Sequence, residues 1–267
     1  MSVLLCVVGR DVVWGVTQLN DVVYIVCSSS SRIERFNATT HQRLTDINVK
    51  DLRVPRDIAA CERTSHVYVA DYPECVWRVS SSDEDMKRCW TKTPSDTFRP
   101  WTLSVTSSRL LVTSRDTKQL MQLNEAGDKV WRVELPEYME PEHAVESPSA
   151  TFIVSHKNTQ LNDPWQSQVS EVNTEGQVLR QFSRSRLSSL RFTQHIAVDS
   201  RGNIFVADEG NRRILLLDAQ LALRRVIIDE HQLNDKPPYR LCYNEQSGQL
   251  MVGFWSGGVA VFDVLQR

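Results

Sequence analysis

Histidine, cysteine and carboxylate side chains are the residues of this chain that could bind a metal or move a proton. The six histidines, at positions 41, 66, 143, 156, 195 and 231, are nowhere three or four residues apart, and there is no H-E-x-x-H sequence. Zinc sites built on one helix or one short loop need that spacing. The chain also has no G-x-S-x-G, no G-x-x-x-x-G-K-[ST] and no G-x-G-x-x-G. Local motifs therefore predict neither a hydrolase nor a nucleotide-binding protein.

The six cysteines are scattered, at positions 6, 27, 61, 75, 89 and 242, and none forms a C-x-x-C pair. Each lies in or beside an apolar run, where a free cysteine behaves as a small hydrophobic side chain. This distribution predicts reduced thiols and a cytoplasmic protein, because disulfides persist mainly in oxidising compartments. The apolar run at residues 3–8 lacks the basic residue and cleavage site of a signal peptide, and no run is long enough to span a membrane.

Length and composition fit one mid-sized globular domain. The 267 residues are 41% apolar and 24% charged, which allows a sizeable core and is not typical of a disordered chain. The formal charge of −2 gives no electrostatic case for bulk nucleic acid or an anionic membrane. Charge is uneven, however, with five glutamates between positions 134 and 146 and seven arginines between 180 and 213.

Residues 202–218, GNIFVADEGNRRILLLD, are the most distinctive part of the sequence. An apolar run ends at Asp208, a polar tip follows, and a second apolar run ends at Asp218. Two apolar runs around a short polar tip are typical of a β-hairpin. Whether Asp208 also does chemistry depends on whether this pattern occurs once or is repeated.

The pattern occurs six times. If Val206 is the anchor of its run, the equivalent anchors are Ile25, Val69, Val112, Val154 and Val252. Their spacings are 44, 43, 42, 52 and 46 residues, and each copy contains four short apolar runs joined by polar turns, except that the sixth lacks its fourth run. Four strands per unit at this period predict the blades of a β-propeller, because a single blade cannot bury both of its faces.

The two ends of the chain complement each other. The sixth unit ends with its third run, in GVAVFDVLQR, and the run at residues 3–8 belongs to no first unit. We therefore expect residues 3–8 to supply the outer strand of the last blade, which closes the ring and removes an open sheet edge. The predicted fold is all-β, a single six-bladed propeller domain over residues 1–267 with four antiparallel strands per blade.

The repeat resembles the NHL repeat, whose pattern is roughly P-x-G-I-A-V-D, then G-x-I-x-V-A-D, then N-x-R-I. The fifth unit matches it in HIAVDSRGNIFVADEGNRRILLLD, and the second matches more weakly through Pro55, Ile58, Ala59, Val69, Ala70 and Asp71. The other four keep mainly the apolar framework. The chain is thus similar to the NHL propellers that end TRIM-type ubiquitin ligases. It contains no RING, B-box or coiled coil, so the resemblance implies recognition and assigns no ligase chemistry.

The repeat also favours a structural role for Asp208. An aspartate recurs at its position only as Asp71, and the other four units have Cys27, Ser114, His156 and Phe254 there. We expect Asp208 to accept hydrogen bonds from its turn and from Arg213, with a metal ligand as the alternative.

Some six-bladed propellers are enzymes with a metal in the central channel. A gluconolactonase-like group holds calcium with carboxylates and an Asn, and an amidating lyase holds zinc with histidines from several blades. Here only His143 and His195 begin inner runs, one short of a three-histidine zinc site. The inner runs also carry Asp57, Glu146, Asp199 and Asn244, but at different heights, so these need not converge on one ion. We predict no metal, cofactor or enzymatic activity, with a calcium-dependent hydrolase as an open alternative.

The candidate binding residues lie on one face of the predicted ring. In a propeller blade, the loop before the inner strand and the loop between the second and third strands emerge on the same face. Aligning the inner runs on the x of P-x-G gives Trp14, Arg56, Trp101, His143, Gln194 and Tyr239. Flanking positions and the second set of loops add Arg99, Arg115, Trp165, Arg191, Arg212, Arg213, Arg240 and Trp255. Trp, Tyr and Arg are enriched in binding hot spots, so this rim face is the predicted binding surface.

The predicted function is a non-catalytic module that recognises a protein or peptide partner on the rim face, as the partner-recognition part of a TRIM-NHL-like protein. The alternative is an RNA-binding NHL domain, because some relatives bind single-stranded RNA on the rim and arginines outnumber lysines here by 24 to 7. We expect no membrane partner and a monomeric domain.

Overall fold

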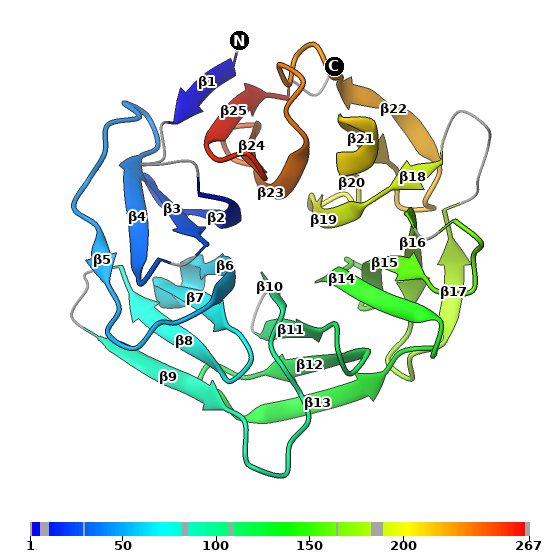
Figure 1. Ribbon diagram of the computed structural model, residues 1–267, viewed down its shortest axis with the longest axis horizontal. Coiled ribbons are helices and arrows are strands. Elements are labelled where there is room, and N and C mark those ends of the chain that lie inside the picture. The colour runs from blue at the N-terminus through cyan, green and yellow to red at the C-terminus, as the bar shows by residue number, and fades with distance from the viewer. Residues whose placement is uncertain are drawn as a thin grey trace.

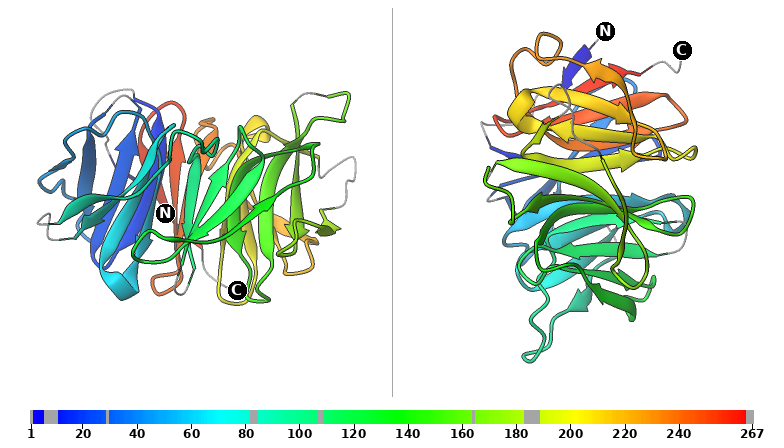
Figure 2. Two further views of the ribbon diagram at one scale, coloured as in Figure 1. Left: turned by 90° about the horizontal axis from the view of Figure 1, so that it is seen from below. Right: turned by 90° about the vertical axis from the view of Figure 1, so that its right-hand side faces the viewer.

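Six antiparallel sheets stand around a central axis in a computed structural model of the chain (Figure 1). The structure describes residues 2–5, 11–28, 30–81, 85–106, 109–163, 165–182 and 189–264. Each sheet is built on four strands, and the predicted all-β propeller of six four-stranded blades is confirmed. Seen from the side, the ring is a disc that is wider than it is tall (Figure 2).

The strands follow the same order in every blade, from the axis outward. The innermost strands are β2 (Val13–Leu19), β6 (Pro55–Cys61), β10 (Thr102–Val105), β14 (Met139–Glu146), β19 (Thr193–Val198) and β23 (Pro238–Asn244). The second strands are β3 (Val22–Cys27), β7 (His66–Asp71), β11 (Leu110–Ser114), β15 (Phe152–Asn158), β20 (Ile204–Asp208) and β24 (Gln249–Phe254). The third strands are β4 (Arg32–Asn37), β8 (Cys75–Ser80), β12 (Gln119–Leu123), β16 (Gln166–Val172), β21 (Arg213–Leu217) and β25 (Val259–Asp263).

An outer strand completes each blade, and the outer strands of blades two to five are exposed or half-buried over almost their whole length. The outer strands are β5 (Ile47–Asn48), β9 (Met86–Thr91), β13 (Lys129–Glu134), β17 (Val178–Gln181), β22 (Leu223–Ile228) and β1 (Ser2–Leu5). A further short strand, β18 (Leu190–Arg191), pairs with β16, and two 3-10 turns, η1 (Glu62–Thr64) and η2 (Glu209–Asn211), follow β6 and β20.

The N-terminal strand closes the ring as predicted. β1 pairs with β25 in antiparallel register, with Ser2 opposite Phe262 and Leu5 opposite Val259. Both chain ends lie on the same side of the ring (Figure 1). Residues 6–8, which the sequence also assigned to this strand, lie outside the described residues.

The blades are held together by apolar packing between neighbouring sheets. All six predicted anchor residues lie in the second strands and have an exposed fraction of 0%. Successive side chains of a strand point to opposite faces, so one strand serves two interfaces. In β3, Tyr24 and Val26 pack against blade two, whereas Ile25 packs against Met251 and Val259 of blade six. Every blade therefore depends on both neighbours.

Cysteine side chains fill several of these interfaces. Cys27, Cys61 and Cys75 are buried and free, and Cys89 and Cys242 are free and partly buried. Burial raises the pKa of Cys27 and of Cys75 to about 12, so their thiols stay protonated and unreactive at neutral pH. Within the described residues, no helix has the length and hydropathy needed to cross a bilayer.

Removing β1 tests the ring closure. We expect deletion of residues 1–5 to lower the Tm of the whole protein by about 5 °C or more, in one cooperative transition, because β25 would become an open edge. Thermal unfolding followed by circular dichroism measures this. Deletion of residues 265–267, which leaves every described strand in place, is the control. An unchanged Tm without residues 1–5 would contradict closure by β1.

Candidate functional site

A β-bulge near the start of the inner strand sets up the candidate site. The register between first and second strands shifts after Val13, Pro55, Pro141, Thr193 and Pro238. A bulge puts two residues of one strand opposite one of its partner and re-aims a side chain. The bulged residues are Trp14, Arg56, Glu142, Gln194 and Tyr239, and in blade three Trp101 directly precedes β10.

This register corrects the predicted position of His143. The bulge of blade four follows Pro141, as those of blades two and six follow Pro55 and Pro238, so Glu142 is the equivalent of Arg56 and Tyr239. His143 comes one residue later and is only 1% exposed. Its prediction as a rim residue is therefore wrong. The alignment was one residue out because it began at the apolar run and did not count the bulge.

The residue after each of the five bulges, together with Thr102 after Trp101 in blade three, belongs to what we call the axial ring. In every blade this residue directly precedes the partner of the anchor residue, and the six are Gly15, Asp57, Thr102, His143, His195 and Arg240. The five that have side chains are at most 7% exposed. Arg240 was also predicted at the rim, and its 1% exposure shows that this prediction is wrong.

Arg240 is held on the axis by backbone carbonyls. Its Nε donates to the carbonyl oxygen of Trp14 at 2.7 Å, and its two terminal nitrogens donate to those of Tyr239 at 3.2 Å and Arg56 at 3.4 Å. One guanidinium thus joins the inner strands of blades six, one and two. Gly15 allows the inner strand of blade two to approach closely, because a Cβ there would lie 2.6 Å from the nitrogen of Ile58 and 2.9 Å from Oδ1 of Asp57.

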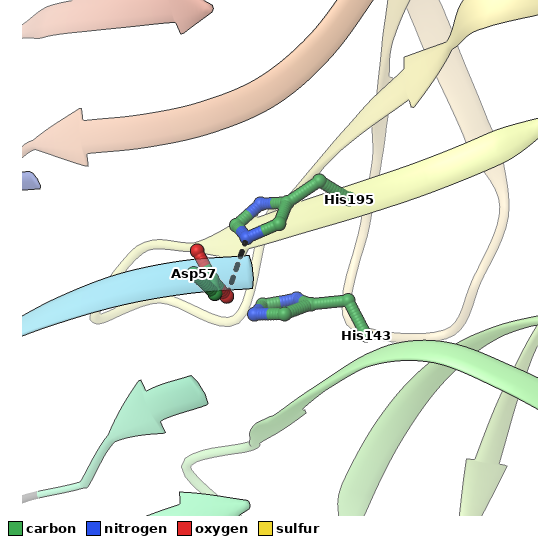
Figure 3. Close-up of side chains that lie close together, drawn as sticks. All are labelled: Asp57, His143 and His195. Carbon is green, nitrogen blue, oxygen red and sulfur yellow. Dashed lines mark ion pairs between the residues drawn. The ribbon is translucent and has the colours of Figure 1, made fainter. Parts of the chain in front are cut away.

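Asp57, His143 and His195 come from three blades and meet beside the axis (Figure 3). Asp57 accepts the N–H groups of Ile58 and Leu103, both at 2.9 Å, and its Oδ2 lies 3.6 Å from Nε2 of His195. Burial raises the pKa of Asp57 and lowers the pKa of both histidines well below the usual value. At neutral pH both imidazoles are therefore uncharged.

The hydrogen bonds also fix which ring nitrogens carry protons. Nε2 of His143 lies 3.1 Å from the carbonyl oxygen of Leu103, so this nitrogen donates. Nδ1 of His195 accepts the N–H of Leu241 at 3.4 Å, which leaves its Nε2 proton directed at Asp57. The two rings stack with centroids 3.6 Å apart and planes 23° apart.

These three residues are the part of the described chain that could hold a metal, since one ligand atom of each lies within 4.8 Å of the others. Two imidazoles and a carboxylate suit zinc or iron. The geometry opposes this, because lone pairs of nearly parallel stacked rings do not converge on one point. The positive charge of Arg240 also lowers the pKa of both imidazoles and would repel a cation. The cluster is better explained as a hydrogen-bonded plug.

A cavity of about 390 Å³ opens above the plug, on the face where the inner strands begin, and we call it the rim cavity. Seven of the predicted binding residues line it: Trp14, Trp101, Arg115, Trp165, Gln194, Tyr239 and Trp255. The prediction that the two sets of loops share one face is thereby confirmed. Phe192, Ser167, Lys157, Glu142 and Glu209, which the sequence reasoning did not single out, complete the wall.

The aromatic side chains of the rim cavity contact one another. Trp14, Tyr239 and Trp255 are mutually edge-to-face, with ring centroids 5.0 to 5.8 Å apart. Tyr239 is 3% exposed and acts as the floor, whereas Trp255 is 48% exposed and Trp165 is 51% exposed. Arg56 does not line the cavity; its guanidinium lies 4.1 Å from the Trp14 ring and 4.6 Å from the Trp101 ring, between the two.

Most of the other predicted arginines are ion-paired. Arg115 contacts Glu140 and Glu142, and outside the cavity Arg99 contacts Asp116, Arg212 contacts Asp235 and Arg213 contacts Asp208. Arg191 is exposed on β18, and its backbone N–H donates to Asp208. The sequence predicts all five on the rim face, but only Arg115 lines the rim cavity. The side chains that do not line it are those of Arg99, Arg191, Arg212 and Arg213.

The two glutamates of the rim cavity are unusual acids. Burial raises the pKa of Glu142 to about 7, although Arg115 contacts one oxygen at 3.4 Å and the indole N–H of Trp101 donates to the other at 3.3 Å. Burial and the nearby Glu142 raise the pKa of Glu209 to about 7, and Gln194 is its hydrogen-bond partner. Pro141 corresponds to the proline of P-x-G in blade four, so an alignment on that proline would have identified Glu142. No local sequence motif identifies Glu209.

A second cavity, of about 960 Å³, opens on the opposite face. The far ends of the inner strands line it, with Glu62, Arg63 and Glu245 at its mouth, and it includes His143 and His195. The axial ring lies between the two cavities, so the propeller has two separate concave surfaces.

Asp208 has the structural role that the sequence predicted. It is 0% exposed and accepts hydrogen bonds from Arg213 Nε at 2.7 Å, from Nδ2 of Asn211 and from the backbone N–H of Arg191. Asp71 does the same in blade two, where it accepts from the N–H of Val54 at 2.7 Å and the indole of Trp77 at 3.1 Å.

Comparison with known proteins shows the fold and no family. No family model matches the chain, and no curated protein matches its sequence. A chain of a nidogen/laminin complex is 14% identical with a TM-score of 0.67, covering 89% of this chain and 87% of its own. The WD40 propeller of Doa1 is 15% identical (TM-score 0.64, 99% and 96% covered), and a streptogramin B lyase is 8% identical (TM-score 0.65, 98% and 96% covered).

The raised pKa of Glu142 predicts a pH-dependent gain from Glu142→Gln. Between pH 4.5 and 7 the unfolded state loses this proton while the folded state keeps it, so stability falls as pH rises through that window. Above pH 7 the cost is about 3 kcal/mol. We expect Glu142→Gln to raise the free energy of unfolding, relative to the parent, by about 2–3 kcal/mol more at pH 8 than at pH 5. Urea unfolding measures it. Glu137→Gln is the exposed control, and a pH-independent difference would contradict the assignment.

The plug interpretation predicts little response to metals. We expect EDTA or equimolar zinc to change the Tm by less than about 1 °C, because binding would have to break the hydrogen bonds of His143 and His195. Differential scanning fluorimetry is sufficient. A zinc-dependent rise in Tm that His195→Asn abolishes would overturn the plug interpretation.

Proposed function

We propose that the propeller is a non-catalytic module that binds a peptide segment of a protein partner in the rim cavity. The observation that supports this most directly is the wall of the cavity, where six aromatic residues surround a space of about 390 Å³: Trp14, Trp101, Trp165, Phe192, Tyr239 and Trp255. That volume suits one or two side chains of a peptide.

The exposure of these rings favours a ligand over internal packing. Trp165 and Trp255 leave about half of their surface in water, and Phe192 is 36% exposed. Aromatic anchors in pockets supply most of the energy of many interfaces. Burying the remaining surface of two indoles under a peptide would therefore add several kcal/mol of apolar stabilisation.

Ion pairing argues against RNA as the main ligand. Binding to RNA releases counterions when arginines neutralise phosphates. Here Arg99, Arg115, Arg212 and Arg213 already contact carboxylates, and two glutamates face the cavity. A phosphate backbone crossing this face would meet as many negative groups as positive ones.

Peptide selection tests the proposal. A random peptide library displayed on phage would be selected on the immobilised propeller, and the Kd of the enriched peptides measured by fluorescence polarisation. We expect Trp255→Ala to weaken binding at least about 30-fold, since a hot-spot residue is worth 2 kcal/mol or more. Leu179→Ala, which removes an equally exposed side chain from the outer strand β17, is the matched control. Enriched peptides that ignore Trp255 would contradict the site.

Salt dependence separates the peptide from RNA. We expect random single-stranded RNA to bind above micromolar Kd at physiological salt, and selected peptides to change little between 50 and 200 mM salt. Tight RNA binding with a steep salt slope that Arg191→Glu reduces would instead support the RNA-binding alternative.

A further inference from the structure

We propose that the rim cavity contains a subsite for an alkylammonium group, the side chain of a lysine in the bound peptide, formed by Trp165, Glu209 and Trp255. The inference rests on the proposed function in one respect only, that the lysine belongs to a peptide. Three observations support it: the position of the three residues, their exposure, and the placement of the protein's own Lys and Arg side chains.

The three residues occupy equivalent places in consecutive blades. Each lies between the second and third strands of its blade, with Trp165 between β15 and β16, Glu209 between β20 and β21, and Trp255 between β24 and β25. All three line the rim cavity. A carboxylate thus lies on the blade between two half-exposed indoles, which is the combination that an organic cation requires.

The protein's own cations show which rings are already used. Guanidinium groups lie over Trp14, Trp101 and Tyr239: Arg56 lies 4.1 Å from the Trp14 ring, Arg115 lies 5.4 Å from the Trp101 ring, and Arg240 lies 4.1 Å from the Tyr239 ring. Within the described residues, no Lys or Arg lies over Trp165 or Trp255. These two rings therefore keep faces that a ligand cation can use.

Among the described residues, the carboxylates in and beside the cavity wall can likewise be divided into those that contact a cationic side chain and one that does not. Glu142 contacts Arg115, and Glu140 contacts both Arg115 and Lys157, so the cations of the cavity wall are matched by these two acids. In the described part of the chain, Glu209 has no ion pair with its side chain, and its partner is the neutral Gln194. The carboxylate and the indole faces that lack a cation are therefore neighbours in one cavity.

The shape of the subsite suits an ammonium group. Trp255 meets Trp14 at an interplanar angle of 74° and Tyr239 at 75°, so the rings form the walls of a corner. A compact ammonium fits such a corner and can direct its N–H groups at one carboxylate.

A small-molecule probe tests the subsite without a peptide surface. N-acetyl-lysine methylamide would be titrated into the full-length protein, with the indole N–H signals followed by NMR. N-acetyl-norleucine methylamide, which keeps the alkyl chain and lacks the charge, is the matched probe. We expect saturable millimolar binding of the lysine probe and at least tenfold weaker binding of the norleucine probe. Equal binding of the two probes, or no binding of either, would overturn the proposal.

Variants assign the binding to the three residues. We expect Glu209→Gln to weaken the lysine probe about tenfold and Trp255→Ala to abolish its binding, while Glu230→Gln, on an exposed turn, leaves it unchanged. Thermal unfolding of each variant confirms that it is folded. A Glu209→Gln variant that binds the probe as the parent does would overturn the role of the carboxylate.

The pH dependence gives a second readout. The pKa of Glu209 is about 7, so its ionised fraction rises about tenfold from pH 6 to pH 8, and the affinity for a lysine that stays protonated rises with it. The charged groups facing Glu209 are Glu142, which titrates in the same direction, and the guanidinium of Arg240. Affinity that is flat across this range in the parent protein would count against Glu209 as the contact.

The probe and the peptide library separate the two proposals. Selected peptides that depend on Trp255 but keep their affinity when lysine is replaced by norleucine would overturn the ammonium subsite and leave peptide binding intact. A lysine probe that binds, with no peptide retained from the library, would support the subsite and overturn the proposed peptide function.

Discussion

The buried guanidinium of Arg240 is the constraint on which the centre of the propeller depends. A charged group away from water is costly unless its hydrogen bonds are made inside the protein. The bulges make this possible, because they turn the carbonyls of Tyr239, Trp14 and Arg56 toward the axis instead of into the sheet ladder. Three inner strands are thereby fixed relative to one another.

The same arrangement gives the rim cavity its form. Once Arg240 occupies the axis, Trp14 and Tyr239 pack above it, and Arg56 is held between Trp14 and Trp101. These residues form a floor in which the faces of the aromatic rings are already covered by the protein's own guanidinium groups. The outer loops of blades four to six, which carry Trp165, Glu209 and Trp255, have no such covering in the described residues, so the surface available to a ligand is displaced from the axis toward those blades.

The sequence predicts what depends on local pattern and misses what depends on ring closure. The six anchors, the closing strand and the role of Asp208 could be predicted because each rests on residues close in sequence or on a repeat. His143 was misplaced because a bulge adds one residue without changing the apolar pattern around it. Arg240 was misplaced because its side chain bonds the carbonyls of three inner strands, which no local pattern indicates. Glu209 could not be identified, since only the packing of three blades brings that carboxylate into one cavity with two indoles.

The low sequence identity to other propellers is explained by the different requirements on the apolar framework and on the residues at the centre of the ring. Propellers that are 8 to 15% identical share this fold, because alternating apolar residues in second and third strands are sufficient to pack one blade on the next. The position after each bulge is free of that requirement. Where the NHL pattern has glycine there, this chain has Asp57, Thr102, His143, His195 and Arg240 in five of six blades. These side chains are buried between the two cavities, which share no lining residue in the described part of the chain, so the two faces are separate concave surfaces.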